Sequence, residues 1–139
     1  MVTLQLFVPG MLVNPLNGGR SRWATMRQGL KWKRNVRLAW LKAGKPSWDG
    51  PATMALTCFV GGCWDAGALE GATKHLRDEA VRLMLDGNPP RRRDKRGRWY
   101  DVPANDGPHS GHAFPPPQQE IRRRAERGVL IQVTPKGGR

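Results

Sequence analysis

Residues 52–65 read Ala-Thr-Met-Ala-Leu-Thr-Cys-Phe-Val-Gly-Gly-Cys-Trp-Asp. The first nine are rich in apolar and β-branched side chains, which predicts a strand over residues 52–60. The pair Gly61 and Gly62 predicts a bulge or a close approach of the backbone. Asp65 then opens a segment, residues 66–85, in which apolar side chains recur at helical spacing. A strand that passes into a helix at an acidic residue is therefore the central unit of the predicted fold.

The chain before this unit predicts one strand and one helix. Residues 2–8 alternate in polarity and stop at a Pro-Gly pair, as a first strand would. After a turn-forming cluster at residues 14–19, Thr25 is a suitable N-cap for a helix that extends to about Ala43 and is closed by Gly44. Apolar residues of this helix are expected to face the core and its cations to face water: Leu30, Val36, Ala39 and Trp40 on one side, Lys31, Lys33, Arg34, Arg37 and Lys42 on the other.

The chain after the central unit predicts a basic loop and a terminal hairpin. The loop covers residues at about 87–104, and three prolines at 115–117 break the chain again. Residues 118–124 and 128–134 are expected to pair as a hairpin around Ala-Glu-Arg-Gly. The order strand, helix, strand, helix, hairpin predicts one α+β domain over residues 1–139, in which a small mixed sheet packs against two helices.

Charge and composition narrow the classes of function. The 139 residues include 24 Lys and Arg but 11 Asp and Glu, which gives a formal net charge of +13 and a pI of about 11.2. So basic a chain predicts a polyanionic partner, most often nucleic acid. Two cysteines, no basic leader and no run of roughly 20 apolar residues predict a cytoplasmic protein with no membrane partner.

Two acidic residues stand out in this basic chain. Asp65 lies at the strand-to-helix junction, and Asp106 lies in the polar, turn-forming stretch 105–112. Mg²⁺ prefers oxygen ligands and binds through a few carboxylates plus water and phosphate, so both residues are candidate metal ligands. The alternative for Asp65 is an N-cap of the helix, and the alternative for Asp106 is a solvent-exposed loop.

Three charged residues of the second predicted helix share one face. Glu70, Lys74 and Asp78 follow one another at spacings of four. In a metal site, Asp78 or Glu70 would add a ligand, and Lys74 would neutralise charge that develops on the phosphate. The alternative is a ladder of ion pairs at the surface.

Two cysteines and two histidines raise a second metal hypothesis. Cys58 and Cys63 are separated by four residues, and His109 and His112 by two. These spacings differ from the usual zinc-finger pattern, and Cys58 falls within a predicted strand. The sequence therefore favours Mg²⁺, with Mn²⁺ as a substitute, over zinc.

Basic side chains gather in the predicted loop and in the first helix. Loop cations adjoin Trp99 and Tyr100, a combination that suits contact with the nucleic-acid backbone and stacking on unpaired bases. The alternatives are a disordered loop and a solvated helix face. A third run, at residues 122–124, lies in the predicted hairpin, with its first and third arginines on one face. The candidate nucleic-acid contacts are Arg20, Arg22, Lys31, Lys33, Arg34, Arg91, Arg92, Arg93, Lys95, Arg96 and Arg98.

The order of these motifs resembles that of the RusA-type Holliday-junction resolvases, a family of compact, basic, phage-associated endonucleases. A first strand leads into a Pro/Asn/Arg-rich loop and a basic helix, then into a strand that ends at Asp65-Ala-Gly-Ala-Leu69. The family's motif is Asp-x-Asp-Asn-Leu or a variant, with a lysine in the same helix and a later Asp-Asp pair. The later pair reads Asn105-Asp106 here.

The resemblance implies a homodimer that cuts branched DNA with Mg²⁺, in the cytoplasm of a bacterial host if a phage encodes it. It assigns metal binding to Asp65 and Asp106. The chain departs from the motif at Gly67 and Ala68, where the family has an acid and an amide, and at Gly71, where it has a lysine; Lys74 lies one turn on. Two alternatives stay open: an inactive relative that binds branched DNA or another nucleic acid, and a basic protein that docks on an acidic protein.

Overall fold

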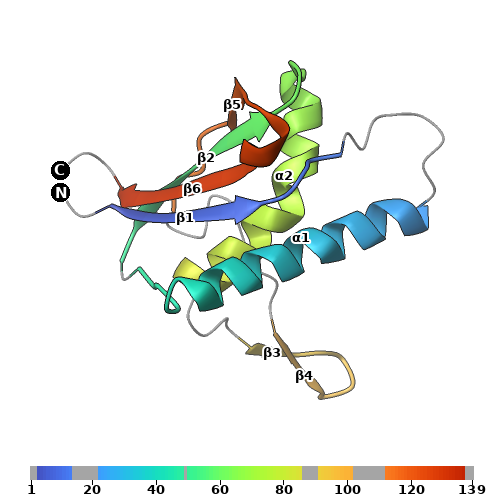
Figure 1. The fold of residues 1–139 in the computed structure, drawn as a ribbon. Coiled ribbons are helices and arrows are strands. Elements are labelled where there is room, and N and C mark those ends of the chain that lie inside the picture. The colour runs from blue at the N-terminus through green and yellow to red at the C-terminus, as the bar shows by residue number, and fades with distance from the viewer. Residues whose placement is uncertain (1–2, 14–21, 49, 86–90, 102–111, 137–139) are drawn as a thin grey trace.

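The structure, a computed structural model, describes residues 3–13, 22–48, 50–85, 91–101 and 112–136. It has two layers, a four-stranded sheet and a pair of helices that covers one face of the sheet (Figure 1). A separate two-stranded hairpin lies on the helix side, away from the sheet (Figure 1). The predicted α+β class, with a mixed sheet against two helices, is confirmed.

The sheet contains the strand that the sequence predicts over residues 52–60. Its strands are β1 (Leu4–Pro9), β2 (Ala52–Val60), β5 (Gln118–Ile121) and β6 (Gly128–Pro135), in the order β1-β6-β2-β5. β6 pairs antiparallel with β1 and with β2, whereas β5 pairs parallel with β2. The predicted strand over residues 52–60 is confirmed to the residue.

The predicted terminal hairpin is wrong. Both of its strands form, but β2 lies between them. β2 is a central strand, with β6 paired on one edge and β5 on the other. The six residues 122–127 cross its end through a short 3-10 turn, Arg124–Glu126, rather than a tight hairpin turn. The Arg122 N–H donates to the Val60 carbonyl at 2.9 Å, which extends the parallel pairing.

Both predicted helices form, but one of their predicted boundaries is wrong. The first, α1, spans Arg22–Lys42, so Thr25 lies inside it rather than at its N-cap. The end is as predicted, because Gly44 has a φ of +87° and its N–H donates to the Leu41 carbonyl at 3.1 Å. The second, α2, spans Ala66–Ala80 and continues as a π-helical turn, Val81–Leu85.

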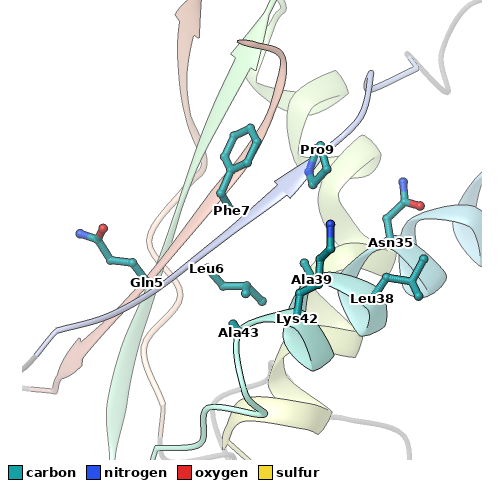
Figure 2. Close-up of a pocket in the computed structure, with 9 residues that line it drawn as sticks. All are labelled: Gln5, Leu6, Phe7, Pro9, Asn35, Leu38, Ala39, Lys42 and Ala43. Carbon is teal, nitrogen blue, oxygen red and sulfur yellow. The ribbon is translucent and has the colours of Figure 1, made fainter. Parts of the chain in front are cut away.

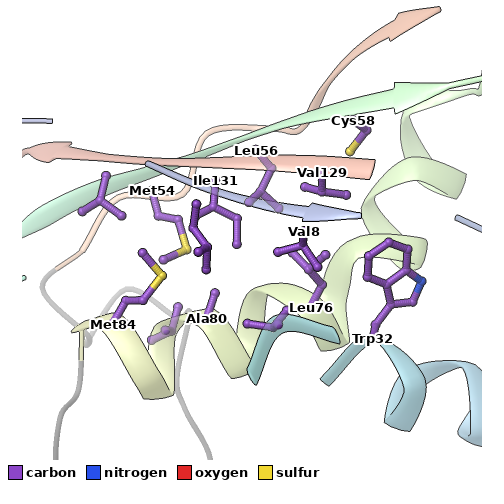
Figure 3. Close-up of a cluster of buried hydrophobic side chains, with 14 of the residues drawn as sticks. Val8, Trp32, Met54, Leu56, Cys58, Leu76, Ala80, Met84, Val129 and Ile131 are labelled. Atoms are coloured by element: carbon purple, nitrogen blue, oxygen red, sulfur yellow. The ribbon is translucent and has the colours of Figure 1, made fainter. Parts of the chain in front are cut away.

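The core lies between the sheet and the two helices. In β2 the buried side chains alternate from Ala52 to Val60, and α2 contributes Leu69, Leu76 and Ala80 (Figure 3). From α1 the core receives Trp32 and Val36, which are four residues apart and share a face. Leu30, expected in the core, is 58% exposed, because it lies about 200° around the helix from Trp32.

The two helices approach closely where they pack. A side chain at Gly29 of α1 would place its Cβ 2.7 Å from the His75 ring of α2, so glycine makes room for this contact. Glu79 of α2 is 6% exposed and binds Arg37 of α1 at 3.3 Å, and it also pairs with Arg82. The basic helix is therefore attached to α2 through a buried carboxylate.

The predicted basic loop contains a hairpin in its described part. β3 (Arg91–Arg93) pairs antiparallel with β4 (Trp99–Asp101). The turn forms because the Asp94 side chain accepts hydrogen bonds from the N–H groups of Arg96 at 2.8 Å and Arg98 at 2.9 Å. Gly97 supplies the positive φ, +79°, that the turn needs.

No helix in the described ranges is long and apolar enough to cross a membrane.

Candidate functional site: an acidic helix start and two basic surfaces

Asp65 caps α2 at the point where the chain leaves β2. Its backbone is extended, with φ −72° and ψ 157°, and its Oδ1 accepts a hydrogen bond from the Ala68 N–H at 2.9 Å. The residue is exposed. The N-cap alternative is thus the observed local role of Asp65. One carboxylate oxygen makes the cap, and the group as a whole faces solvent.

Gln119 of β5 holds the residue before Asp65. Its Oε1 accepts from the Trp64 N–H at 2.9 Å, and its Nε2 donates to the Trp64 carbonyl at 2.8 Å. Parallel pairing places Gln119 opposite Cys58, on the same sheet face. Sequence reasoning missed this clamp, because its two ends are 55 residues apart and it depends on the parallel pairing of β5 with β2.

The other acids of α2 are engaged with cations. Lys74 Nζ lies 3.7 Å from Asp78 Oδ2, so this part of the predicted ladder is confirmed. Glu70 instead binds Arg77, with 2.8 Å between Oε1 and Nη2. Arg77 is 5% exposed, and its guanidinium also lies 6.0 Å from the centre of the Phe114 ring.

Asp65 differs from all other acids whose side chains are described. It has no ion-pair partner among the described side chains, whereas each of the others lies within ion-pairing distance of a lysine or arginine: Glu70, Asp78, Glu79, Asp94, Glu120 and Glu126. In a chain of net charge +13, an acid without a neighbouring cation is available to an incoming cation.

The spacing along α2 limits which residues can act together with Asp65. Asp78 lies 13 positions on, or about 20 Å along the axis at 1.5 Å per residue, so these two carboxylates cannot share one ion. Glu70 is about 7 Å along the axis and about 140° around the helix from Asp65, and its carboxylate binds Arg77. Within the described ranges, no three His, Cys, Asp or Glu residues gather as metal ligands would.

Asp106, the other predicted ligand, lies outside the described residues. The first described residues after it, His112 and Ala113, lie at the beginning of β2: the Ala52 N–H donates to His112 Nδ1 at 3.2 Å, and Ala113 bridges to Thr53. Asp65 follows the other end of the same strand. Joint metal binding by Asp65 and Asp106 stays a prediction.

The described cysteines and histidine do not form a zinc site. Cys58 is buried in β2, and burial raises the pKa of its thiol to about 12. Cys63 is exposed beyond the end of β2, whereas His112 lies at the beginning of that strand. His109 lies outside the described residues.

The hairpin carries one of the two basic surfaces. The Arg93 guanidinium lies 4.8 Å from the centre of the Trp99 ring, and Trp99 is 54% exposed. Lys95, Arg96 and Arg98 are exposed around the turn. We name residues 93–99 the basic hairpin tip. The side chains of Arg91 and Arg92 lie outside the described set.

Helix α1 carries the other basic surface. Lys31 and Arg34 are exposed and Lys33 is half-buried. The helix contains no Asp or Glu. Its outer side also exposes large apolar residues: Trp23, Met26, Leu30, Leu38 and Leu41. Arg20 and the side chain of Arg22 lie outside the described set.

Arg122 is occupied within the protein. Its guanidinium binds Glu120 at 3.0 Å, lies 3.8 Å from Glu126 and lies over the Phe59 ring at 5.2 Å. The predicted alternation of Arg122 and Arg124 along one hairpin strand is wrong, because residues 122–127 form the crossing with its 3-10 turn.

Comparison with known proteins found no relative of this chain. No protein-family model matches it, and no curated protein matches it in sequence. The fold and the geometry of the described residues therefore carry the functional argument.

Proposed function

We propose that this protein is a RusA-like endonuclease, which binds branched DNA such as Holliday junctions and hydrolyses phosphodiester bonds with Mg²⁺ or Mn²⁺. The observation that carries the proposal is the exposed carboxylate of Asp65 at the end of the central strand. It is the acid that the described side chains leave without a cation. Its position matches the first acid of the family motif.

Residues of this chain would bind the metal ion and position the DNA phosphates at this site. Asp65 would ligate the metal together with Asp106, and the Gln119 clamp on Trp64 would fix the direction of the Asp65 backbone. A bound Mg²⁺ supplies a Lewis acid for the phosphate and an activated water. Lys74 lies nine positions after Asp65, about 13 Å along α2. We therefore propose that its ammonium binds a DNA phosphate next to the one that is cleaved.

Two basic surfaces support DNA as the substrate. Both α1 and the basic hairpin tip present cations to solvent, and Trp99 offers an aromatic face next to them. Asp65 caps the N-terminal end of α2, and the hairpin lies on the helix side of the molecule, below α1 in the view (Figure 1).

Cleavage of a four-way junction tests the proposal. Labelled mobile junctions are incubated with the protein in Mg²⁺, in Mn²⁺ and in EDTA. We expect symmetric nicks in either metal and none in EDTA. Asp65→Asn should abolish the nicks yet keep junction binding, because a lost carboxylate lessens repulsion of the phosphates. Asp78→Asn is the matched control on the same helix, and it should cut normally.

A second candidate function is favoured by a specific observation. Glu70 and Asp78 are held by Arg77 and Lys74, so neither is offered to a metal beside Asp65. Gly67 further stands where the family has its second acid. These features fit an inactive relative that binds branched DNA. Tight junction binding in EDTA, with no nick in Mg²⁺ or Mn²⁺, would establish this candidate and exclude the endonuclease.

The proposed substrate also calls for a two-fold assembly. A homodimer would present two Asp65 carboxylates to symmetry-related strands of a junction. Sedimentation at micromolar concentration should show a dimer, alone or with junction DNA. A monomer under both conditions would contradict this part of the proposal.

A further inference from the structure

A groove follows the outer edge of the sheet. It encloses about 630 Å³ between the edge strand β1 and the C-terminal half of α1 (Figure 2). The volume is in the range of ligand sites. The described residues that line it come from these two elements: Gln5, Leu6, Phe7 and Pro9 from the strand, and Asn35, Leu38, Ala39, Lys42 and Ala43 from the helix and its end.

The strand side of the groove offers backbone groups. β1 is the last strand of the sheet and pairs with β6 on its inner edge. In an antiparallel pair, alternate residues direct their N–H and C=O groups away from the partner, so the outer edge of β1 can accept another strand. β1 reads Leu-Gln-Leu-Phe-Val-Pro and has no charged side chain to block that edge.

The helix side offers apolar contacts and one charge. Leu38 is 50% exposed and lines the groove from α1. Phe7 lines it from β1, but its ring points away from α1 (Figure 2) and packs on Phe59, with 6.1 Å between the ring centres. Lys42 extends from α1 toward β1 (Figure 2) and is the single charged residue among the described ones that line the groove. No acid of the described part of the chain lines the groove, and α1 contains none. The groove thus complements an extended segment that carries apolar side chains and an anion.

We propose that this groove binds an extended acidic segment of a partner protein. The segment adds a strand to β1, places an apolar side chain against Leu38, and sets a carboxylate against Lys42. A second copy of this chain fits less well, because its uncharged β1 and its acid-free α1 would bring no anion to either Lys42. This site is separate from Asp65 and does not depend on nuclease activity.

A selection on the whole protein tests the proposal. Random peptides displayed on phage are selected for binding, and the enriched peptide is synthesised with and without N-methylation of alternate backbone amides. Enriched sequences should alternate apolar and acidic residues. In ¹⁵N spectra, the peptide should shift the amide signals of residues 4–8 and 35–43. N-methylation should abolish binding, because it removes the donors that an added strand needs.

Charge reversal on α1 distinguishes the groove from general attraction to a basic protein. Lys42→Glu should weaken the peptide about tenfold, since it turns an exposed attraction into a repulsion. Lys31→Glu changes the net charge equally but lies outside the groove, so it should leave the affinity nearly unchanged. Equal losses in both variants, tolerance of N-methylation, or enrichment without acids would overturn the proposal. Displacement of a β1-paired dimer by the peptide would assign the groove to a second copy instead.

Discussion

The two parts of α2 treat their acids differently. From Glu70 onward, every acid of the helix binds a cation, and Glu79 does so while 6% exposed. At the start of the helix, Asp65 is exposed, and among the described residues its side chain binds the Ala68 N–H of the same helix and no cation. In most of the helix, therefore, the carboxylates form ion pairs, whereas the carboxylate at its N-terminal end has no cation beside it among the described residues. An acid's surroundings, rather than its presence in a motif, separate a structural carboxylate from a candidate catalytic one.

Substitution of an ion-paired acid of α2 should lower the free energy of unfolding, and we expect the largest effect at Glu79. Glu79→Gln removes the charge that holds Arg37 of α1 and Arg82. The unfolding free energy should fall by about 2 kcal/mol, less than for a fully buried pair because both arginines are half-exposed. Urea denaturation measures the change. Glu126→Gln, at the exposed Arg122 pair, is the control, and we expect a change below about 0.5 kcal/mol.

The Gln119 clamp should have a smaller effect on stability. Gln119→Ala removes both hydrogen bonds to Trp64 and leaves a half-buried carbonyl and N–H unpaired. We expect a loss of about 1–2 kcal/mol in urea denaturation. Gln118→Ala, the exposed neighbour on β5, is the matched control. Equal stability of the two variants would show that β5 pairing alone orders the start of α2.

The N-terminal end of α2 should show a capping effect that depends on side-chain type rather than charge. Asp65→Ala loses the acceptor for the Ala68 N–H and should cost about 1 kcal/mol of unfolding free energy. Asp65→Asn retains an acceptor and should stay within about 0.5 kcal/mol of the parent protein. If Asp65→Asn destabilised the protein as much as Asp65→Ala, the carboxylate charge itself would be structural, and the contrast between the two parts of α2 would fail.

The smallest expected effect concerns the two cysteines around the end of β2. Cys63 is exposed and should react with a thiol reagent at pH 8 in the native state, whereas Cys58 should react after unfolding. Because burial raises the folded pKa of Cys58 from 9.0 to about 12, its stabilising contribution is complete below pH 9 and is lost as the pH rises toward 12. Cys58→Val should therefore lose less stability than the parent protein between pH 8 and pH 11. An identical alkaline slope would contradict the burial of Cys58.

Local patterns predicted most of the elements, and long-range pairing explains what they missed. The apolar run at residues 52–60 and the helical spacing after Asp65 are properties of neighbouring residues, so both predictions hold. The terminal hairpin failed because strand adjacency depends on which strand is central. The prediction for Leu30 failed because apolar side chains occur on several sides of α1. The side that carries Trp32 and Val36 packs against the core, and Leu30 lies on another side.

The site was predictable in part for the same reason. The cap at Asp65 and the Lys74–Asp78 pair follow from spacing within one helix. The Glu70–Arg77 pair spans two turns, and the Gln119 clamp joins two strands, so neither has a local signature. The turn at Asp94 and Gly97 had a signature, an Asx turn with glycine, within the segment that we had expected to be a loop.

Cleavage of a mobile four-way junction in Mg²⁺ by the parent protein, Asp65→Asn and Asp78→Asn tests the central claim most directly. All three proteins should bind the junction, so the rate of nicking separates the two carboxylates. If Asp65 is the catalytic acid, the parent protein and Asp78→Asn should cut the junction. Asp65→Asn should cut at a rate at least about a hundredfold lower, which is the usual effect of losing a key catalytic group. Equal cutting by Asp65→Asn, or no cutting by a parent protein that binds the junction, would contradict it.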